Sequence, residues 1–432
     1  MNKPNNADRQ VRLNDPQDLP RVAPFFKNLE IIGPASERLK ELEKPEFLAE
    51  DNDIGEVTID AESPILMTSQ EVRRAYTSND FNRIKEIEAQ SQKDIDPVYD
   101  NITNNGDEAW DTVRDPESGE EFSMSWSDNA SVWCYAKNSG ASRSGDQSHQ
   151  NLVSIGTYSV SSSVAGIQSY NLTTKVLLTE TIVATAMRYA IAQVMKTGIN
   201  FVTEAITGYI IQGFAKVGVK ASVRIVSRAV GALTVSLTFA VVFICIIFLF
   251  NFLNRLYTIR LMIYNWSSTD DWEVNGQYMG NAVLPGEEEQ LTKDLKFTIP
   301  KALSSGDSVA PPGFQDLETL DAICYTATLA WQNDATFLAG CEMAIQVRKV
   351  GTTEGFMWAF HCPRFSDNTQ AADDGLQDPE QYFNNVKWNS NPLGFEIRST
   401  SDNIPISIAL DALSYGTDNA YTINMHIDQE MT

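Results

Sequence analysis

Residues Ala229–Asn254, AVGALTVSLTFAVVFICIIFLFNFLN, carry no charge and are closed by Arg228 and Arg255. As an α-helix these 26 residues would extend about 39 Å, more than the ~30 Å hydrocarbon core of a bilayer. From Leu233 to Leu253, 15 residues are Leu, Ile, Phe or Val, which favours membrane insertion by about 5 to 9 kcal/mol before the polar residues are counted. The stretch therefore predicts a helix that either enters lipid or lies hidden in protein.

The charge around this stretch is unevenly distributed. The whole chain has a formal net charge of −24, but residues 171–264 contain nine basic and two acidic residues, a net charge of +7. The remainder therefore carries −31, which is −24 minus +7. A strongly acidic chain repels phosphates, so nucleic acid is not expected as a partner. The pattern indicates a basic, apolar middle within an acidic, soluble exterior.

The N-terminus and the cysteines give little indication of the compartment. The first residues, MNKPNNADRQVRLNDPQDLPRV, are polar and interrupted by proline, so no secretory signal peptide is expected. The five cysteines are scattered and include no CxxC pair, which predicts neither a disulfide framework nor a zinc site. The redox compartment therefore stays open.

The pattern along the chain divides it into four regions. Residues 1–60 are polar and proline-containing, which is typical of an irregular or extended arm. Residues 61–170 mix amphipathic helical patterns with alternating runs such as SVWCYA that predict short strands. Residues 171–258 are predicted to be helical, with a second apolar segment at Ile199–Ala215, and residues 259–432 to be all β. The expected fold class is α+β: a central apolar helical bundle or hairpin, a C-terminal antiparallel β-sandwich, and a mixed, partly irregular N-terminal region.

Four basic residues lie between the two apolar segments at intervals of four: Lys216, Lys220, Arg224 and Arg228. On a helix this spacing places them along one face. Like charges at this spacing repel by a few tenths of a kcal/mol per pair, so anionic lipid or the acidic part of the protein would relieve them. A solvated helix face is the simpler explanation, and it stays open.

The last region contains short runs that alternate or are bounded by turn signals. The expected strands are Lys296–Ile299, Ala322–Trp331, Phe337–Lys349, Gly355–His361, Phe395–Arg398, Ile404–Leu410 and Tyr421–Ile427. Just before them, Tyr257, Tyr264 and Trp266 stand where interfacial aromatics would anchor a spanning helix. The alternation of Ile259 and Ile263 equally predicts a strand, and the strand is preferred.

No constellation of residues in the sequence points to an enzyme. The three histidines, His149, His361 and His426, lie in separate regions. No HExxH motif or nucleophile elbow is present, and neither a phosphate loop nor a calcium loop is complete. The prediction is a protein without enzymatic activity, metal or cofactor.

One arrangement accounts for the acidic exterior, the basic glycine-containing helical middle and the single spanning-grade stretch. It is a water-soluble protein that hides a membrane segment until it meets a membrane. In this architecture Val176–Asn254 resembles the α-helical pore-forming toxins, over about a fifth of the chain. The resemblance implies release without a conventional signal peptide, homo-oligomerisation, alone or with a second component, and a helix-lined pore in a target-cell membrane. The β region would bind a receptor or lipid.

The resemblance also implies roles for individual residues. Positions expected to meet lipid in the inserted helix are Leu237, Phe239, Val242, Phe243, Ile246, Ile247 and Phe250. Positions expected at headgroups or at the pore mouth are Lys216, Lys220, Arg224, Arg228 and Arg255, with Tyr257, Tyr264 and Trp266 as interfacial aromatics.

Two alternatives remain open. The chain is a constitutive single-pass membrane protein with soluble flanking domains, or it is a soluble structural or binding protein whose apolar helix is the buried centre of a bundle. A helix that is apolar on all sides must be wrapped on every face, and few other segments are apolar enough to do so.

Overall fold

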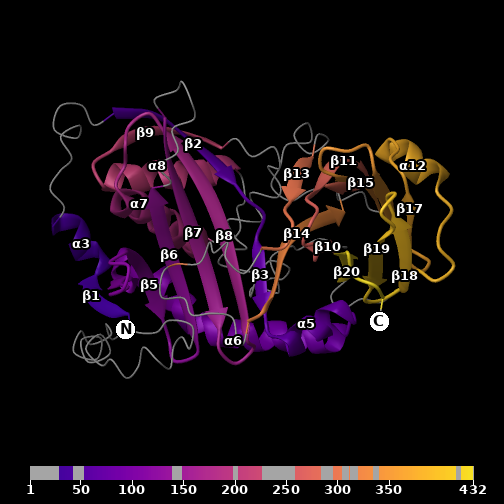
Figure 1. The fold of residues 1–432 in the computed structure, drawn as a ribbon, viewed down its shortest axis with the longest axis horizontal. Coiled ribbons are helices and arrows are strands. Elements are labelled where there is room, and N and C mark those ends of the chain that lie inside the picture. Colours follow the sequence, from indigo (N-terminus) through magenta and orange to yellow (C-terminus); the bar gives the residue numbers. More distant parts are fainter. Residues whose placement is uncertain are drawn as a thin grey trace.

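The computed structural model describes residues 29–41, 53–138, 148–197, 203–225, 258–283, 295–303, 311, 320–333, 340–414 and 420–431. The stretch Ala229–Asn254 lies outside these residues, as do Arg228, Arg255 and Tyr257, so the lipid-facing assignments stay predictions. Within the described residues, strands dominate and form two sheets, of 15 and 5 strands. Figure 1 shows two lobes side by side, with strand β3 (Ile65–Thr68) between them.

The N-terminal lobe is a twisted sheet with helices on one face. Its elements are β1 (Glu30–Pro34), α3 (Ala35–Glu41), β2 (Asp53–Ala61), η1 (Gly106–Ala109), β4 (Asp111–Arg114), β5 (Glu121–Trp126), β6 (Ala130–Asn138), β7 (His149–Ser159), β8 (Val164–Thr174), α7 (Glu180–Thr197), α8 (Thr203–Lys216) and β9 (Lys220–Ile225). Side chains of α7 and α8, such as Ile182 and Phe214, share a buried core with Ile155 and Leu172 of the sheet. The helices are therefore held by burial against strands.

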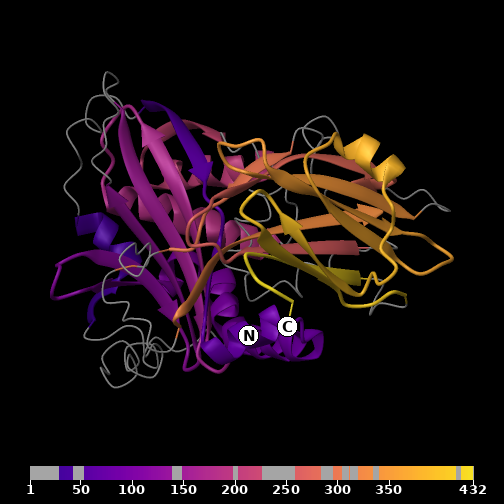
Figure 2. The same cartoon turned by 45° about the vertical axis from the view of Figure 1, so that its right-hand side comes forward.

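The C-terminal lobe consists of two sheet layers. Its elements are β10 (Thr258–Asn265), β11 (Trp272–Gly280), β12 (Ala282–Val283), β13 (Lys296–Ile299), β14 (Ala322–Asn333), β15 (Cys341–Lys349), β16 (Gly355–Cys362), β17 (Thr369–Asp374), α12 (Pro379–Asn385), β18 (Gly394–Ser399), β19 (Ile404–Leu410) and β20 (Ala420–Ile427). The smaller sheet, ordered β13-β11-β15-β16-β17, shares a core with the end of the larger sheet. Trp331 and Trp358 meet between the layers, with ring centroids 6.2 Å apart. Figure 2 shows the strands of this lobe, coloured from salmon to yellow, beside the magenta strands of the N-terminal lobe.

The larger sheet runs through both lobes in the order β1-β4-β5-β6-β7-β8-β3-β14-β10-β20-β19-β18. Strand β3 makes the connection, because Ile65 is the register partner of Ile167 in β8 and of Tyr325 in β14. Both pairings are antiparallel, and all four residues of β3 are buried. A single short strand thus joins the two halves of one sheet.

Helices α5 (Gln70–Thr77) and α6 (Phe81–Asn105) follow β3 and lie along one end of the molecule (Figure 1). Near the start of α6, Ile87 packs with Met262 of β10, whereas Ile102 belongs to the core of the N-terminal lobe. Glu88 of α6 accepts a hydrogen bond of 3.2 Å from the Arg260 guanidinium, and both side chains are 8 % exposed. Helix α6 therefore packs against both lobes.

The predicted α+β class with a central apolar helical bundle is wrong. The described chain is mostly β-sheet, and α7 and α8 are laid on a sheet face instead of forming a bundle. The apolar periodicity of this region reflects burial against strands. The resemblance to α-helical pore-forming toxins rested on a helical middle, so the assignments that depended on it, a membrane-inserting pore and a cytolysin, are wrong with it.

The basic run at intervals of four was also misplaced. Helix α8 ends at Lys216, Gly218 turns the chain with a φ of +78°, and Lys220 begins strand β9. Because four is an even number, Lys220 and Arg224 lie on the same exposed face of a strand. Among the described residues, no helix combines the length and apolarity that a bilayer crossing requires.

Candidate functional site

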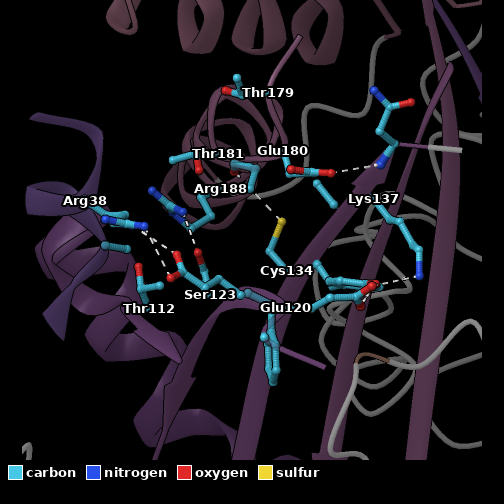
Figure 3. A pocket seen from close by; sticks show the side chains of 18 residues that line it. Arg38, Thr112, Glu120, Ser123, Cys134, Lys137, Thr179, Glu180, Thr181 and Arg188 are labelled. Carbon is cyan, nitrogen blue, oxygen red and sulfur yellow. Dashed lines mark hydrogen bonds and ion pairs between the residues drawn. The ribbon is translucent and has the colours of Figure 1, made fainter. Parts of the chain in front are cut away.

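A pocket of about 500 Å³ lies at the edge of the N-terminal lobe, between α7, α3 and strands β4 to β6 (Figure 3). Its lining side chains are mostly polar, and they come from segments distant in sequence. They include Arg38, Thr112, Glu120, Glu121, Ser123, Cys134, Lys137, Asn138, Thr179, Glu180, Thr181 and Arg188. A cavity of this size with convergent polar groups is a candidate binding site.

Arg188 of α7 forms the floor of the pocket, with a side chain only 2 % exposed. Its Nε donates to Asp107 Oδ1 at 3.2 Å, Nη1 donates to Ser123 Oγ at 2.6 Å, and Nη2 donates to Thr185 Oγ1 at 3.1 Å. A guanidinium has five N–H donors, so these bonds use three of them. Two donors of a buried cation are left without a partner among the described residues.

Helix α7 supplies one wall of the pocket through residues four apart. Glu180, Ala184 and Arg188 all line the cavity, as this spacing on one helix face requires. Eight residues of helix correspond to about 12 Å along the axis, so the backbone positions of Glu180 and Arg188 are two turns apart. The Glu180 Oε1 atom accepts a hydrogen bond of 3.3 Å from the backbone N–H of Asn138. The helix therefore gives the pocket opposite charges at its two ends.

The remaining charged side chains of the pocket are paired with one another. Arg38 and Arg114 both donate to Glu121, at 3.0 Å and 2.6 Å. Burial alone would raise the pKa of Glu120, but hydrogen bonds from Tyr135 and Lys137 outweigh it and lower that pKa. Lys137 and Glu120 balance each other, whereas Arg38 and Arg114 share the single Glu121 carboxylate.

Cys134 lies in the wall of the pocket as an inert thiol. Burial raises its pKa to about 12, an effect that the nearby Arg188 charge only partly opposes. Its Sγ is 3.9 Å from the carbonyl oxygen of Ala184, to which it donates. The described lining residues include no histidine that could deprotonate it. Nucleophilic chemistry at this thiol is disfavoured.

Of the residues singled out from the sequence, those that the structure describes are not among the lining residues of this pocket: Lys216, Lys220, Arg224, Tyr264 and Trp266. Lys216 is exposed at the end of α8, with its ammonium 4.2 Å from the centre of the Tyr189 ring. Tyr264 is 1 % exposed inside β10 and stacks on His426, with ring centroids 4.8 Å apart. Trp266 is half-buried, and its Nε1 donates to His426 Nδ1 at 3.1 Å. The two described aromatics therefore belong to the joint between α5 and β10.

Sequence reasoning missed the pocket. Its one visible signal was Arg188, a single arginine within the apolar helical run IVATAMRYAIA. Such a residue must be paired or serve a ligand when the helix is buried. Within the described part of the chain, no three His, Cys, Asp or Glu side chains gather closely enough to hold a metal ion.

Comparisons with known proteins leave the site unassigned. No family model and no curated protein sequence matches this chain. Among solved structures, one similar chain is that of the crystal structure of RahU protein in complex with a TRIS molecule. It is 9 % identical, the match covers 41 % of this chain and 98 % of that one, and the TM-score is 0.22. At that score the likeness decides neither fold nor function, so the function must be argued from the chain's own residues.

Proposed function

We propose that this protein is a binding protein, not an enzyme, and that its pocket takes a small ligand with an anionic end. One observation carries the proposal: Arg188 is a buried guanidinium at the floor of a cavity and retains two unused N–H donors. A carboxylate or a phosphate accepts two parallel N–H bonds from such a group.

The surrounding groups support this class of ligand. Asp107 pairs with the Nε side of Arg188 but is not among the residues that line the pocket, whereas Arg188 is. The hydroxyl groups of Ser123 and Thr181 also line the pocket and can donate to ligand oxygens. At the mouth, the Glu180 carboxylate favours a ligand whose far end is polar or cationic. A short zwitterion or a small polar acid would best complement Arg188 and Glu180.

Binding of small anions by the full chain tests the proposal. Titration calorimetry with succinate, inorganic phosphate and a zwitterionic amino acid should detect saturable binding at low salt. Arg188→Lys keeps the charge but loses the planar fork, so affinity should fall by about 2 kcal/mol, roughly thirtyfold. Arg83→Lys, the same change at an exposed arginine of α6 that is not among the lining residues, is the matched control and should leave affinity unchanged.

A second variant separates binding from folding. Ala184→Leu places a larger apolar side chain in the cavity and leaves the Arg188–Asp107 pair in place, so the protein should fold and fail to bind. Full binding by Ala184→Leu, or no binding of any of these anions by the unmodified chain, would sink the proposal.

A further inference from the structure

A second cluster of polar and aromatic side chains lies on the outer face of the smaller sheet, beside α12, at the far end of the molecule from the pocket (Figure 1). Glu342 of β15 is the register partner of Gly280 in β11 and of His361 in β16, so the three form one row across the sheet. The neighbouring rings, here named the aromatic cluster, are those of Tyr278, His361, Phe383 and Trp388.

The Glu342 carboxylate lacks a permanent cationic partner. Its Oε2 accepts a hydrogen bond of 3.2 Å from the Tyr278 hydroxyl, and its Oε1 lies 3.9 Å from His361 Nε2. Burial lowers the pKa of His361, so this imidazole is neutral at neutral pH. Among the described residues, no lysine or arginine comes within ion-pair distance of Glu342. A carboxylate that is 30 % exposed thus stands beside aromatic rings with its charge uncompensated.

The aromatic cluster offers more ring surface than the attachment of α12 needs. Tyr382 already anchors that helix, since it is 2 % exposed, packs on Met357 and Ala359, and donates to Asp373 Oδ2 at 2.8 Å. The next residue, Phe383, lies 5.1 Å from the Tyr278 ring and 5.4 Å from the Trp388 ring, between centroids. All of these rings remain half-buried, so each keeps part of its surface open.

Gly280 makes room for the carboxylate. A Cβ atom at this position would lie 2.5 Å from Glu342 Oε2 and 2.7 Å from the Tyr278 hydroxyl oxygen. The backbone of Gly280 is not in the left-handed region, so space and not conformation accounts for the glycine. The glycine therefore lets the Glu342 carboxylate and the Tyr278 hydroxyl lie close over the backbone of β11.

We propose that Glu342 and the aromatic cluster bind an alkylammonium group. The Glu342 carboxylate would neutralise the positive charge of the ligand. The aromatic rings would contact the methyl groups on the ligand's nitrogen through cation–π attraction, which is strongest for the indole ring of tryptophan. Such a group could come from either of two sources, a free quaternary amine or the headgroup of a choline lipid. The site is separate from the Arg188 pocket, so either can fail without the other.

Titration of the full chain with choline and tetramethylammonium tests the proposal, with calorimetry as the readout. Choline should bind, whereas 3,3-dimethyl-1-butanol, its uncharged isostere, should bind at least about tenfold more weakly. Sodium chloride at matched concentration corrects for ionic strength. Choline and its isostere binding equally would overturn the proposal.

Three variants locate the binding on this face. Glu342→Gln should weaken choline by about tenfold while its amide oxygen still accepts from Tyr278, and Phe383→Leu should weaken it by about two- to fivefold. Glu86→Gln, an exposed carboxylate of α6, is the matched change of charge and should have no effect. Unaltered choline affinity of Glu342→Gln would also overturn the assignment.

Two vesicle preparations distinguish the sources of the cation. Co-sedimentation with phosphatidylcholine vesicles but not with phosphatidylglycerol vesicles, lost in Glu342→Gln, would identify a lipid headgroup. Binding of free choline without co-sedimentation would identify a dissolved amine. Absence of binding to choline, tetramethylammonium and both vesicles by the unmodified chain contradicts the proposal.

Discussion

The two halves of the larger sheet bury their faces in different ways. In the N-terminal lobe polar groups enter the interior: the buried Asp94 carboxylate of α6 accepts hydrogen bonds from Ser159 Oγ at 2.7 Å and from the Ser161 N–H at 3.0 Å. In the C-terminal lobe the interior between the layers is rich in aromatic rings, as in the stack of Trp358 on Phe360. The candidate pocket of the first lobe is lined largely by polar side chains, whereas the polar and aromatic cluster of the second lies on the outer face of its smaller sheet.

The largest effect is expected from breaking the ion pair between Glu88 of α6 and Arg260 of β10. Glu88→Gln removes one carboxylate of a buried ion pair that joins α6 to β10, so the free energy of unfolding should fall by about 3 to 5 kcal/mol. Urea denaturation followed by circular dichroism and tryptophan fluorescence measures this. Two separated transitions would show that the lobes unfold independently once the ion pair is lost.

A charge-matched control and a rescue accompany this variant. Glu86→Gln, on the same helix with a side chain 67 % exposed, should change the unfolding free energy by less than about 0.5 kcal/mol. Replacing both partners, as Glu88→Met with Arg260→Met, should recover much of the loss. A loss below about 1 kcal/mol in Glu88→Gln would contradict the role given to the pair.

A smaller effect should appear at acid pH, at the joint between the lobes. Burial lowers the pKa of His426 to about 3, so the folded protein holds this imidazole neutral where the unfolded chain, with a pKa near 6.5, takes up a proton. Stability should therefore fall as the pH drops from about 6.5 toward 3, by about 2 kcal/mol at pH 5 from this group. His426→Gln should reduce the slope of unfolding free energy between pH 7 and pH 5, and an unchanged slope would refute the assignment.

Two glycines of the N-terminal lobe, Gly156 and Gly208, should respond in opposite ways to substitution by alanine. Gly156 of β7 lies under the Trp133 ring, and a Cβ atom there would be 1.9 Å from Trp133 Cζ2. Gly156→Ala should destabilise the lobe by about 1 to 3 kcal/mol, and adding Trp133→Phe should recover part of that. Gly208→Ala in α8, where nothing lies within 4 Å of the added atom, should instead stabilise by up to about 1 kcal/mol. Thermal unfolding of these variants decides the signs.

The smallest effect concerns thiol reactivity and compares the lobes without altering stability. Cys134 in one lobe and Cys362 in the other are buried, and burial raises the pKa of each to about 12. In a Cys245→Ser background, iodoacetamide should label them only at the rate of local opening. Peptide mass spectrometry over time then reports which lobe opens first. Immediate labelling of either thiol in the folded protein would show that its lobe is not closed.

Several strands of the C-terminal lobe and the helices near α7 and α8 could be predicted from the sequence, but the strands β9, β11 and β17 could not. Alternation and turn residues placed Lys296–Ile299 and Ile404–Leu410 with the bounds that the structure has. The apolar content of residues 171–225 indicates that they are buried, but it does not show which elements cover them. Basic residues spaced four apart lie on one face of a strand as well as of a helix. The sequence therefore predicted that this region is buried and that it contains helices, but it predicted neither strand β9 nor the packing of the helices on a sheet.

The pocket was beyond prediction because its parts are distant in the chain. The partners of Arg188, Asp107 and Ser123, are 81 and 65 residues away from it, and only the sheet order β4-β5-β6 with α7 across it brings them together. A single arginine in an apolar helix indicates that its side chain has a hydrogen-bonding partner, but it does not identify the partner.

The position of β3 has a consequence for the order of events during synthesis. Its partner in β14, Tyr325 opposite Ile65, is made about 260 residues later. At ~5–20 residues per second the ribosome needs roughly 10 to 50 s to reach it. Until then the N-terminal half-sheet has an open edge of unpaired N–H and C=O groups, the kind of edge along which nascent chains join one another. Yield in cells should therefore depend on translation speed and chaperones more than the stability of the finished fold would suggest.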